Sequence, residues 1–131
     1  MYENFHGNET ILVADDEPLV LSLTASILKV CGYHVLVAPN GNEAVDSYGR
    51  QEKVDLVLTD IIMPVMTGPE LVHKLRQINP DLRCVYMSGY DQSAIQERIG
   101  NKVCDYLRKP FTPAALLEKI RNTLDAKPEV N

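Results

Sequence analysis

The sequence predicts an α/β fold, a doubly wound parallel sheet of five strands with helices on both faces. Short apolar runs alternate five times with amphipathic stretches along the 131 residues, which is the pattern of consecutive βα units. Connections between parallel strands are right-handed, and parallel sheets need cover on both faces, so the helices divide between the two sides. Apolar residues make up 45% of the chain, enough for the core of a single domain.

The predicted strands are short runs rich in aliphatic and β-branched residues. They lie at Thr10–Ala14, His34–Ala38, Leu56–Thr59, Arg83–Met87 and Asp105–Arg108. The third run is apolar almost throughout, and Pro64 prevents a helix from following it directly. This strand is therefore predicted to be buried, with Asp60 at its end.

The predicted helices fill the intervals between and after these strands. They lie at Pro18–Val30, Asn42–Gln51, Pro69–Ile78, Ser93–Gly100 and Pro113–Leu124. Three of them carry an apolar stripe at helical spacing, which predicts a buried face. The stripes are Leu19, Leu23, Ile27 and Val30 in the first helix, Leu71, Val72, Leu75 and Ile78 in the third, and Leu116, Leu117, Ile120 and Leu124 in the fifth.

Capping and breaking residues mark several helix ends. The predicted N-terminal caps are Asn40 with Glu43, and Thr112 followed by Pro113. The predicted stops are Gly32, Asn79 and Pro80. We expect one domain over residues 9–125, with a flexible tail at 1–8 and a short tail at 126–131.

Composition excludes several classes of function. A net charge of −5 and a pI near 5.1 argue against nucleic-acid binding, which needs clustered Lys and Arg. No apolar run approaches the roughly 20 residues of a membrane span, and no signal peptide is recognisable, so we expect a cytoplasmic domain without membrane contact. The three cysteines, Cys31, Cys84 and Cys104, are widely spaced, which predicts reduced thiols, inert in the core at positions 84 and 104.

Polar and charged residues follow four of the predicted strands. The first strand is followed by Asp15-Asp16-Glu17, the third by Asp60, the fourth by Ser88-Gly89 and the fifth by Lys109-Pro110. In parallel sheets ligands bind outside the carboxyl ends of the strands, so these residues are predicted to meet at one edge.

This set of side chains is suited to phosphoryl transfer. Carboxylates that lie close together repel one another, so they need neutralising cations or a raised pKa. Lys109 supplies one positive charge, and Mg²⁺, which is commonly held by one or two carboxylates, supplies more. With the Ser88 hydroxyl nearby, Asp60 is then a candidate nucleophile that forms an aspartyl phosphate.

With these motifs in this order, the chain resembles the receiver domain of two-component response regulators over residues 9 to 125. The matching residues are Asp15-Asp16-Glu17, Thr59-Asp60-Ile61-Ile62-Met63-Pro64, Gly68, Met87-Ser88-Gly89 and Tyr106-Leu107-Arg108-Lys109-Pro110-Phe111. The resemblance implies a flavodoxin-like fold with strand order 2-1-3-4-5. It also implies that Asp60 accepts a phosphoryl group from a phosphohistidine and that the domain then switches conformation.

The resemblance assigns a role to each residue of the site. Asp16, Asp60 and the main-chain carbonyl of Ile62 would hold Mg²⁺, with Asp15 acting mainly through a metal-bound water. Further roles fall to Lys109 and Ser88 as phosphoryl ligands, Gly89 as the residue that leaves room for the phosphate, Pro110 after a cis peptide bond, and Tyr106 as an aromatic switch.

The resemblance also sets the expected partners. The phosphoryl donor would be a histidine kinase or a histidine phosphotransfer domain, and the output partner is not specified. The loop motifs are similar to those of receivers at the C-terminus of hybrid sensor histidine kinases, so both an excised and a stand-alone receiver are open, as is a weak homodimer. The chain alone would not be an enzyme beyond its own phosphoryl acceptance and loss.

Rival classes lack residues that they need. An Asp-nucleophile phosphatase of the haloacid dehalogenase type needs a second Asp at position 62, where Ile62 stands. A flavodoxin needs a phosphate loop in place of the three acids at 15–17, and no G-x-G-x-x-G motif is present for a dinucleotide. The remaining alternative is a binding-only receiver that no longer cycles phosphate.

Overall fold

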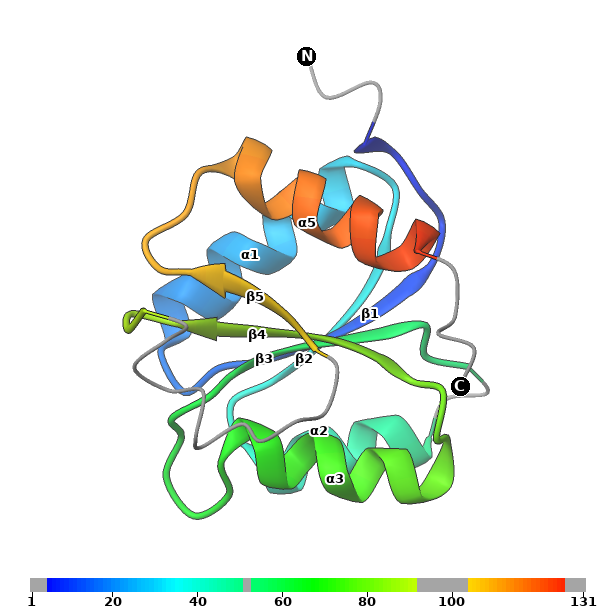
Figure 1. Ribbon diagram of the computed structural model, residues 1–131, viewed down its shortest axis with the longest axis vertical. Coiled ribbons are helices and arrows are strands. Elements are labelled where there is room, and N and C mark those ends of the chain that lie inside the picture. The colour runs from blue at the N-terminus through cyan, green and yellow to red at the C-terminus, as the bar shows by residue number, and fades with distance from the viewer. Residues whose placement is uncertain (1–4, 51–52, 92–103, 127–131) are drawn as a thin grey trace.

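Five parallel strands form a single sheet in the order β2-β1-β3-β4-β5, as the computed structural model in Figure 1 shows. The structure describes residues 5–50, 53–91 and 104–126. The strands are β1 Thr10–Ala14, β2 His34–Ala38, β3 Leu56–Asp60, β4 Arg83–Ser88 and β5 Asp105–Arg108. The predicted fold class and strand order are confirmed.

Helices cover both faces of this sheet. They are α1 Pro18–Val30, α2 Gly41–Gly49, α3 Gly68–Ile78 and α5 Pro113–Asp125. In Figure 1, α1 and α5 lie on one face, and α2 and α3 lie on the other. The predicted helix at Ser93–Gly100 lies outside the described residues. Among the residues described, no helix has the length and apolar character needed to span a bilayer.

Two apolar cores lie on the two faces of the sheet. Alternate residues of each strand point to opposite faces, so Leu12 and Val57 contribute to the α2/α3 core, while Ile11 and Leu58 contribute to the α1/α5 core. The central strands β1 and β3 are buried along nearly their whole length. The predicted stripe of α5 is confirmed, because all four of its residues are buried.

The predicted buried stripe of α1 is wrong for three of its four residues; the fourth, Ile27, is partly buried and packs against the α1/α5 core. Leu19, Leu23 and Val30 are 85%, 62% and 77% exposed. The helix instead buries Thr24, Ala25 and Leu28, whose small members let its backbone lie close to the sheet. In α3, the predicted Leu71, Val72 and Leu75 are buried, but Ile78 is 65% exposed because the helix ends there.

Several element ends differ from the prediction by a residue or two. Asp60 belongs to β3, where it pairs in register with Met87 of β4, and Ser88 extends β4 by one residue. The helix α2 spans Gly41–Gly49 and not 42–51, because Arg50 closes it through its N–H to the Ser47 carbonyl. The Asn40 and Thr112 caps are confirmed, since each side chain accepts a hydrogen bond from the N–H three residues on.

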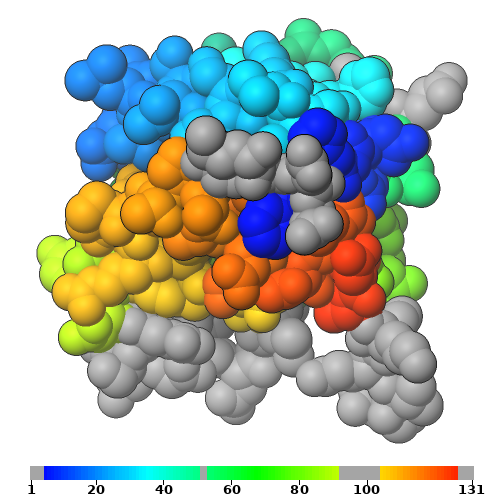
Figure 2. All heavy atoms as spheres, turned by 90° about the horizontal axis from the view of Figure 1, so that it is seen from above, coloured from blue at the N-terminus to red at the C-terminus, as the bar shows by residue number. Residues whose placement is uncertain are grey.

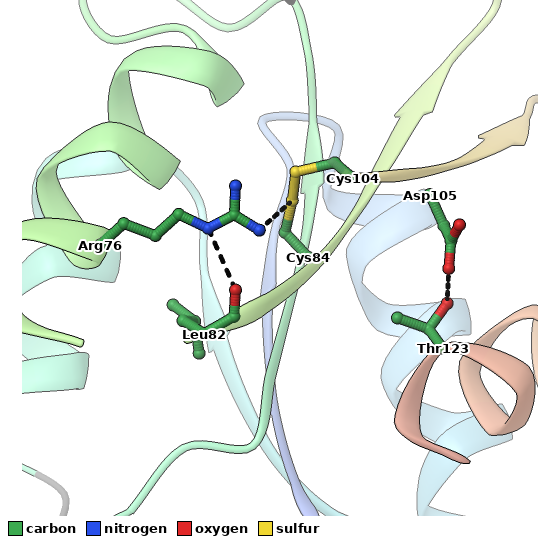
Figure 3. Close-up of a disulfide and its surroundings, with 6 residues drawn as sticks. All are labelled: Arg76, Leu82, Cys84, Cys104, Asp105 and Thr123. Carbon is green, nitrogen blue, oxygen red and sulfur yellow. Dashed lines mark hydrogen bonds between the residues drawn. A yellow bond between two sulfur atoms is a disulfide. The ribbon is translucent and has the colours of Figure 1, made fainter. Parts of the chain in front are cut away.

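The prediction of reduced thiols at positions 84 and 104 is also wrong. Cys84 lies in β4 and Cys104 directly precedes β5, and the two form a disulfide (Figure 3). Their Cα atoms are 5.1 Å apart, within the range that a disulfide can span. Cys31 is a free, buried thiol. The register of two neighbouring strands, which sequence spacing does not reveal, brings the pair together.

Residues ahead of β1 are tied to α5. The Arg121 guanidinium donates to both carboxylate oxygens of Glu9, at 3.1 and 2.5 Å, and to the Tyr33 hydroxyl at 3.1 Å. The Gly7 N–H donates to the Cys31 carbonyl at 3.1 Å. Figure 2 shows this segment, in dark blue, against the orange and red residues of α5. The predicted domain limits stay a prediction, but residues 5–9 pack on the domain.

Candidate functional site

The carboxyl ends of four parallel strands bring the predicted polar residues to one edge of the sheet. Asp15 directly follows β1, Asp60 ends β3, Ser88 ends β4, and Lys109 directly follows β5. Asp60, Ser88 and Lys109 line a cavity of about 590 Å³, together with Asp16. The predicted convergence of these side chains is present in the fold.

The Lys109 ammonium lies between two buried carboxylates. Its Nζ is 2.7 Å from Asp15 Oδ2 and 3.2 Å from Asp60 Oδ2, and Glu17 Oε1 lies at 3.8 Å. Asp15 is fully buried and Asp60 is 7% exposed, so these charges interact with little solvent screening. The lysine therefore holds the two carboxylates together across the sheet.

Three carboxylates at this edge have the arrangement of a metal site. One oxygen from each of Asp15, Asp16 and Asp60 lies within 4.8 Å of the others. One ammonium cannot neutralise this cluster, and oxygen ligands are those that Mg²⁺ prefers. Asp16 is exposed, which leaves the cluster open to solvent on one side. The residues present fit a hard divalent cation.

The electrostatics of Asp60 combine opposing effects. Burial raises the pKa of the Asp60 carboxyl, and the nearby Asp15 charge raises it further. The Lys109 charge and hydrogen bond, and the N–H of Ile62, lower that pKa, but the net direction is upward. Burial also lowers the pKa of Lys109, and its hydrogen bonds to Asp15 and Asp60 more than offset this, so the pKa of the lysine is raised. The raised pKa of Lys109 favours its charged form, and the raised pKa of Asp60 means that burial and the Asp15 charge disfavour its anion.

The loop between β3 and α3 is held close to Asp60. Gly68 donates its N–H to the Ile61 carbonyl at 2.8 Å, and a Cβ at Gly68 would lie 2.3 Å from the Asp60 carbonyl oxygen. Val65 has a φ of 70°, and the Met66 N–H bonds to the Pro64 carbonyl at 2.7 Å. This is a γ-turn centred on a β-branched residue in the left-handed region, a strained conformation. The loop also presents Ile62 to the cavity.

The end of β4 supplies the hydroxyl side of the site. Ser88 is buried, and its Oγ accepts a hydrogen bond from the Tyr90 N–H at 3.1 Å. The Lys109 N–H bonds to the Ser88 carbonyl at 2.7 Å, which joins the ends of β4 and β5. Gly89 lines the cavity, and a Cβ there would meet no heavy atom within 4 Å. The peptide bond between Lys109 and Pro110 is cis, as expected.

Tyr106 lies apart from the cavity. It is half-buried on β5 and pairs in register with Tyr86 of β4. Its hydroxyl is buried and, among the residues described, has no hydrogen-bond partner. The tyrosine shares a face of the sheet with Ser88 but is not among the residues that line the cavity.

The apolar wall of the cavity was not predicted. Val20 and Leu23 of α1 line it, as do Pro110 and Phe111 after β5. Leu23 was assigned to the core, and the signal that could have placed it here is the presence of two separate apolar rows on α1. Glu17, named only as part of the acidic run, also lies within reach of Lys109.

Comparison with known proteins gives one family. The chain matches the family described as "Response regulator receiver domain" over residues 11–121, most of its length. The matched region includes every residue of the site described above.

Individual relatives agree with that match. The chain is 31% identical over 118 residues to the probable transcriptional regulatory protein TcrX of Mycobacterium tuberculosis, covering 88% of this chain and 49% of that protein. It is 31% identical over 121 residues to the sensor kinase CckA of Brucella abortus, covering 91% of this chain and 13% of the kinase. A response regulator receiver protein from Sinorhizobium medicae has a crystal structure that superposes with a TM-score of 0.81 at 31% identity, covering 91% of this chain and 96% of that one. The chain thus spans about half or less of these two curated relatives.

Proposed function

This chain belongs to the response regulator receiver domain family, and from that premise we propose that it accepts a phosphoryl group from a phosphohistidine onto Asp60. In this transfer a carboxylate oxygen of Asp60 forms a bond to phosphorus as the bond from phosphorus to the imidazole nitrogen breaks. The imidazole leaves with the electron pair and takes up a proton. The observation that most directly supports this proposal is the position of the Lys109 ammonium between Asp15 and Asp60, in a carboxylate cluster that is open to solvent.

The side chains of the site divide the work of positioning and charge neutralisation. Asp16, Asp60 and the main-chain carbonyl of Ile62 would hold Mg²⁺, with Asp15 contributing through a water. Bound Mg²⁺ supplies positive charge that neutralises the phosphoryl oxygens. Lys109 pairs with one phosphoryl oxygen, and its position 3.2 Å from Asp60 Oδ2 supports this role.

The end of β4 and the strand β5 carry the response. The Ser88 hydroxyl moves from its Tyr90 contact to a phosphoryl oxygen, and Gly89 leaves space for the phosphate beside it. Pro110, after the cis bond, turns the chain so that Lys109 stays in the site. Tyr106 then turns inward as the switch residue. Phosphorylation acts here by adding charge and strong acceptor oxygens.

The partners follow from the donor chemistry. The donor is a histidine kinase or a histidine phosphotransfer domain in the cytoplasm, and the domain is not an enzyme by itself. Similarity to the sensor kinase CckA supports a place within a hybrid kinase, and the match to a whole receiver chain supports a stand-alone protein. A weak homodimer is compatible with either arrangement.

Labelling with a small phosphoryl donor tests the acceptor. The protein is incubated with Mg²⁺ and acetyl phosphate, and intact mass reports the added phosphoryl group. We expect label on the parent chain and on Asp46→Asn, an exposed control, and none on Asp60→Asn. Equal labelling of Asp60→Asn would assign the acceptor elsewhere. A parent chain that takes no label but binds Mg²⁺ would indicate the binding-only receiver.

A further inference from the structure

Cys84 and Cys104 occupy matched positions on neighbouring parallel strands. Val85 pairs in register with Asp105, so the cysteines form the preceding row, at the edge of the sheet opposite Asp60. Their Cα atoms are 5.1 Å apart and their sulfur atoms are bonded (Figure 3). The backbone pairing of β4 and β5 therefore presents the two thiols to each other without any rearrangement of the fold.

We propose that Cys84 and Cys104 are a redox site, a dithiol that small disulfides oxidise, and that the bond clamps β4 to β5 beside Tyr106. The dithiol chemistry is independent of the phosphoryl chemistry. The consequence for Tyr106 rests on the proposed function.

Arg76 gives the pair the surroundings of a reactive thiol. From α3 its guanidinium donates to the Leu82 carbonyl through Nε at 3.1 Å, and its Nη2 lies 3.7 Å from Cys84 Sγ (Figure 3). This contact directs a fixed positive charge at the sulfur. A cation beside a cysteine favours the thiolate, which is the form that attacks a disulfide.

The solvent exposures of the two cysteines determine which of them reacts first with a small disulfide. Cys104 is partly exposed and Cys84 is only 2% exposed. The Cys104 thiolate attacks one sulfur of a small disulfide RSSR, forms a mixed disulfide and releases RS⁻, which takes the proton that Cys104 gave up. The Cys84 thiolate then attacks the Cys104 sulfur and releases the second RS⁻, which takes the proton from Cys84. The sum is two protein thiols and RSSR giving one protein disulfide and two RSH.

The location of the bond connects it to the proposed switch. Side chains on a strand alternate between faces, so Cys84, Tyr86 and Ser88 share a face, as do Cys104 and Tyr106. The next pair on that face, beyond Val85 and Asp105, is Tyr86 with Tyr106. Cys84 and Tyr86 belong to the α2/α3 core, and Cys104 and Tyr106 are partly buried and pack against it. Bonded sulfur atoms lie closer together than unbonded ones, so oxidation changes the space available to the adjacent tyrosine ring.

The start of β5 is anchored on its other face as well. Thr123 of α5 donates a hydrogen bond to the Asp105 carboxylate (Figure 3). Arg83 at the start of β4 donates to the carbonyls of Leu124 and Ala126 at the end of the same helix. These hydrogen bonds connect α5 to the starts of β4 and β5, and the disulfide adds a covalent connection between the two strands. Closing it therefore restricts movement of β5 relative to β4. Disulfides in cytosolic proteins are usually transient or redox-sensing, which agrees with a switchable bond in the proposed compartment.

Thiol counting tests the redox site. The full chain is equilibrated with reduced and oxidised glutathione at several ratios, quenched in acid, alkylated under denaturing conditions and weighed. As the ratio becomes oxidising, we expect Cys84 and Cys104 to stop reacting with the alkylating reagent, both in the parent chain and in Cys31→Ala. Full alkylation at every ratio, or a bond that includes Cys31, would overturn the proposal.

Single variants test the order of attack and the role of Arg76. Cys84→Ala should accumulate a glutathione adduct on Cys104, whereas Cys104→Ala should stay unmodified because Cys84 is buried. Arg76→Met should slow ring closure about threefold, because less thiolate is only partly offset by greater nucleophilicity. Arg50→Met, at an exposed arginine directly after α2 and away from β4, β5 and α5, is the control. Equal slowing in the two arginine variants contradicts the role given to Arg76.

A second measurement separates the clamp from the phosphoryl site. Beryllofluoride with Mg²⁺ is added as a phosphoryl analogue, and NMR shifts of Tyr106 are recorded in oxidised and reduced protein. We expect the shift change at Tyr106 to fall at least about threefold when the bond is closed, and Cys84→Ala to respond equally in both buffers. An equal response of oxidised and reduced parent chain refutes the coupling. If neither form binds beryllofluoride, the proposed function fails while the thiol counts still decide the redox site.

Discussion

Lys109 is the residue on which the electrostatics of the site depend. Its ammonium contacts the fully buried Asp15 and the nearly buried Asp60, and its side chain is only 14% exposed. Removing one partner of a buried ion pair leaves an uncompensated charge, which costs more than the pair itself contributes. The same ammonium competes with any metal for the carboxylates. Its removal should therefore affect stability and metal binding in opposite directions.

We expect Lys109→Met to lower the free energy of unfolding by about 3 kcal/mol in buffer without Mg²⁺. Mg²⁺ should bind this variant more tightly than the parent chain, because no ammonium opposes it. Urea unfolding with and without Mg²⁺ measures both effects. Lys74→Met, an exposed lysine on α3, should change neither by more than about 0.5 kcal/mol. A Lys109 variant as stable as the control would show that the pairing of Lys109 with Asp15 and Asp60 contributes little to stability.

Tyr86 makes the fold sensitive to alkaline pH. Burial raises the pKa of Tyr86 to about 12, and the nearby Arg76 charge offsets this only in part. Between pH 10 and about 12 the unfolded chain loses this phenolic proton while the folded chain keeps it. The folded state then binds more protons than the unfolded state, so stability falls as pH rises.

The slope of stability against pH should flatten in Tyr86→Phe. At most about 1.4 kcal/mol per pH unit is removed from the alkaline decline, the amount set by one proton. Urea unfolding at a series of alkaline pH values measures the slope. Tyr90→Phe, at an exposed tyrosine, is the control and should keep the slope of the parent chain. Tyr33 has a pKa that is also raised by burial, so a residual slope is expected in both variants.

At the scale of elements, the connection from β3 to α3 is the most constrained segment near the site. The capping box of α3, in which Thr67 and Glu70 exchange hydrogen bonds, fixes where the helix begins. Gly68 then passes so close to the Asp60 carbonyl that no side chain fits. The position of Asp60 thus depends on a glycine eight residues further along the chain.

Gly68→Ala should displace the end of β3. A Cβ 2.3 Å from the Asp60 carbonyl oxygen requires backbone movement, so we expect a loss of about 2 kcal/mol or more and a strong reduction of phosphoryl acceptance. Gly49→Ala is the matched control, because a Cβ there meets nothing within 4 Å and the residue lies in α2. That variant should be neutral or more stable by about 0.5–1 kcal/mol. Denaturant unfolding and acetyl phosphate labelling give the two readouts, and equal behaviour of the two variants would contradict the close approach.

Local patterns were sufficient to predict the elements and the edge at which the site forms. Five alternations of strand and helix give a parallel sheet, and parallel strands place their carboxyl ends together, so Asp15, Asp60, Ser88 and Lys109 could be predicted as neighbours. The ends of β3 and β4 were each one residue short, because the apolar run stops before a polar residue that still pairs in the sheet. Backbone pairing does not depend on polarity, so composition alone misses such residues.

Features that depend on how one element packs or pairs with another could not be predicted. The helix α1 has one row at Leu19 and Leu23 and another at Thr24 and Leu28, and periodicity does not say which row faces the sheet. The disulfide of Cys84 and Cys104 depends on the register between β4 and β5, which the intervening residues do not specify. The capping box at Thr67 could have been found, since the spacing of Thr and Glu by three residues is its signature.

At the scale of the whole molecule, the segment before β1 ties the first and last elements together. Arg121 of α5 bonds to Glu9 through two nitrogens, to Asp125 in its own helix and to the Tyr33 hydroxyl before β2. The hydrogen bond from Arg121 lowers the pKa of Glu9 below its ordinary value of 4.5. The stability that this tie contributes is present above that value and is lost as the pH falls through the lowered pKa. The two ends of the domain are joined most firmly at neutral pH.

Arg121→Met should lower the free energy of unfolding by about 2 kcal/mol, because it removes a bidentate pair whose arginine side chain is only 17% exposed. Arg108→Met removes a single pair with Asp91 in which both side chains are more than half exposed. We expect that control to cost about 0.5 kcal/mol or less. Thermal or urea unfolding of the two variants measures the contrast. Similar losses would mean that the segment before β1 contributes little to the domain.

The hydroxyl of Tyr106 has an energetic consequence for the whole domain. Within the described residues this buried group has no partner, and an unpaired buried hydroxyl raises the free energy of its conformation by about 1–3 kcal/mol. Inverting a two-state equilibrium from 1:99 to 99:1 takes about 5.5 kcal/mol. A conformation in which the phenol hydroxyl hydrogen-bonds to water or to a carbonyl avoids this cost of the unpaired hydroxyl. The gain offsets part of the free energy needed to invert the equilibrium. If Tyr106 turns inward upon phosphorylation as proposed, this gain would lower the free energy that the phosphoryl group has to supply.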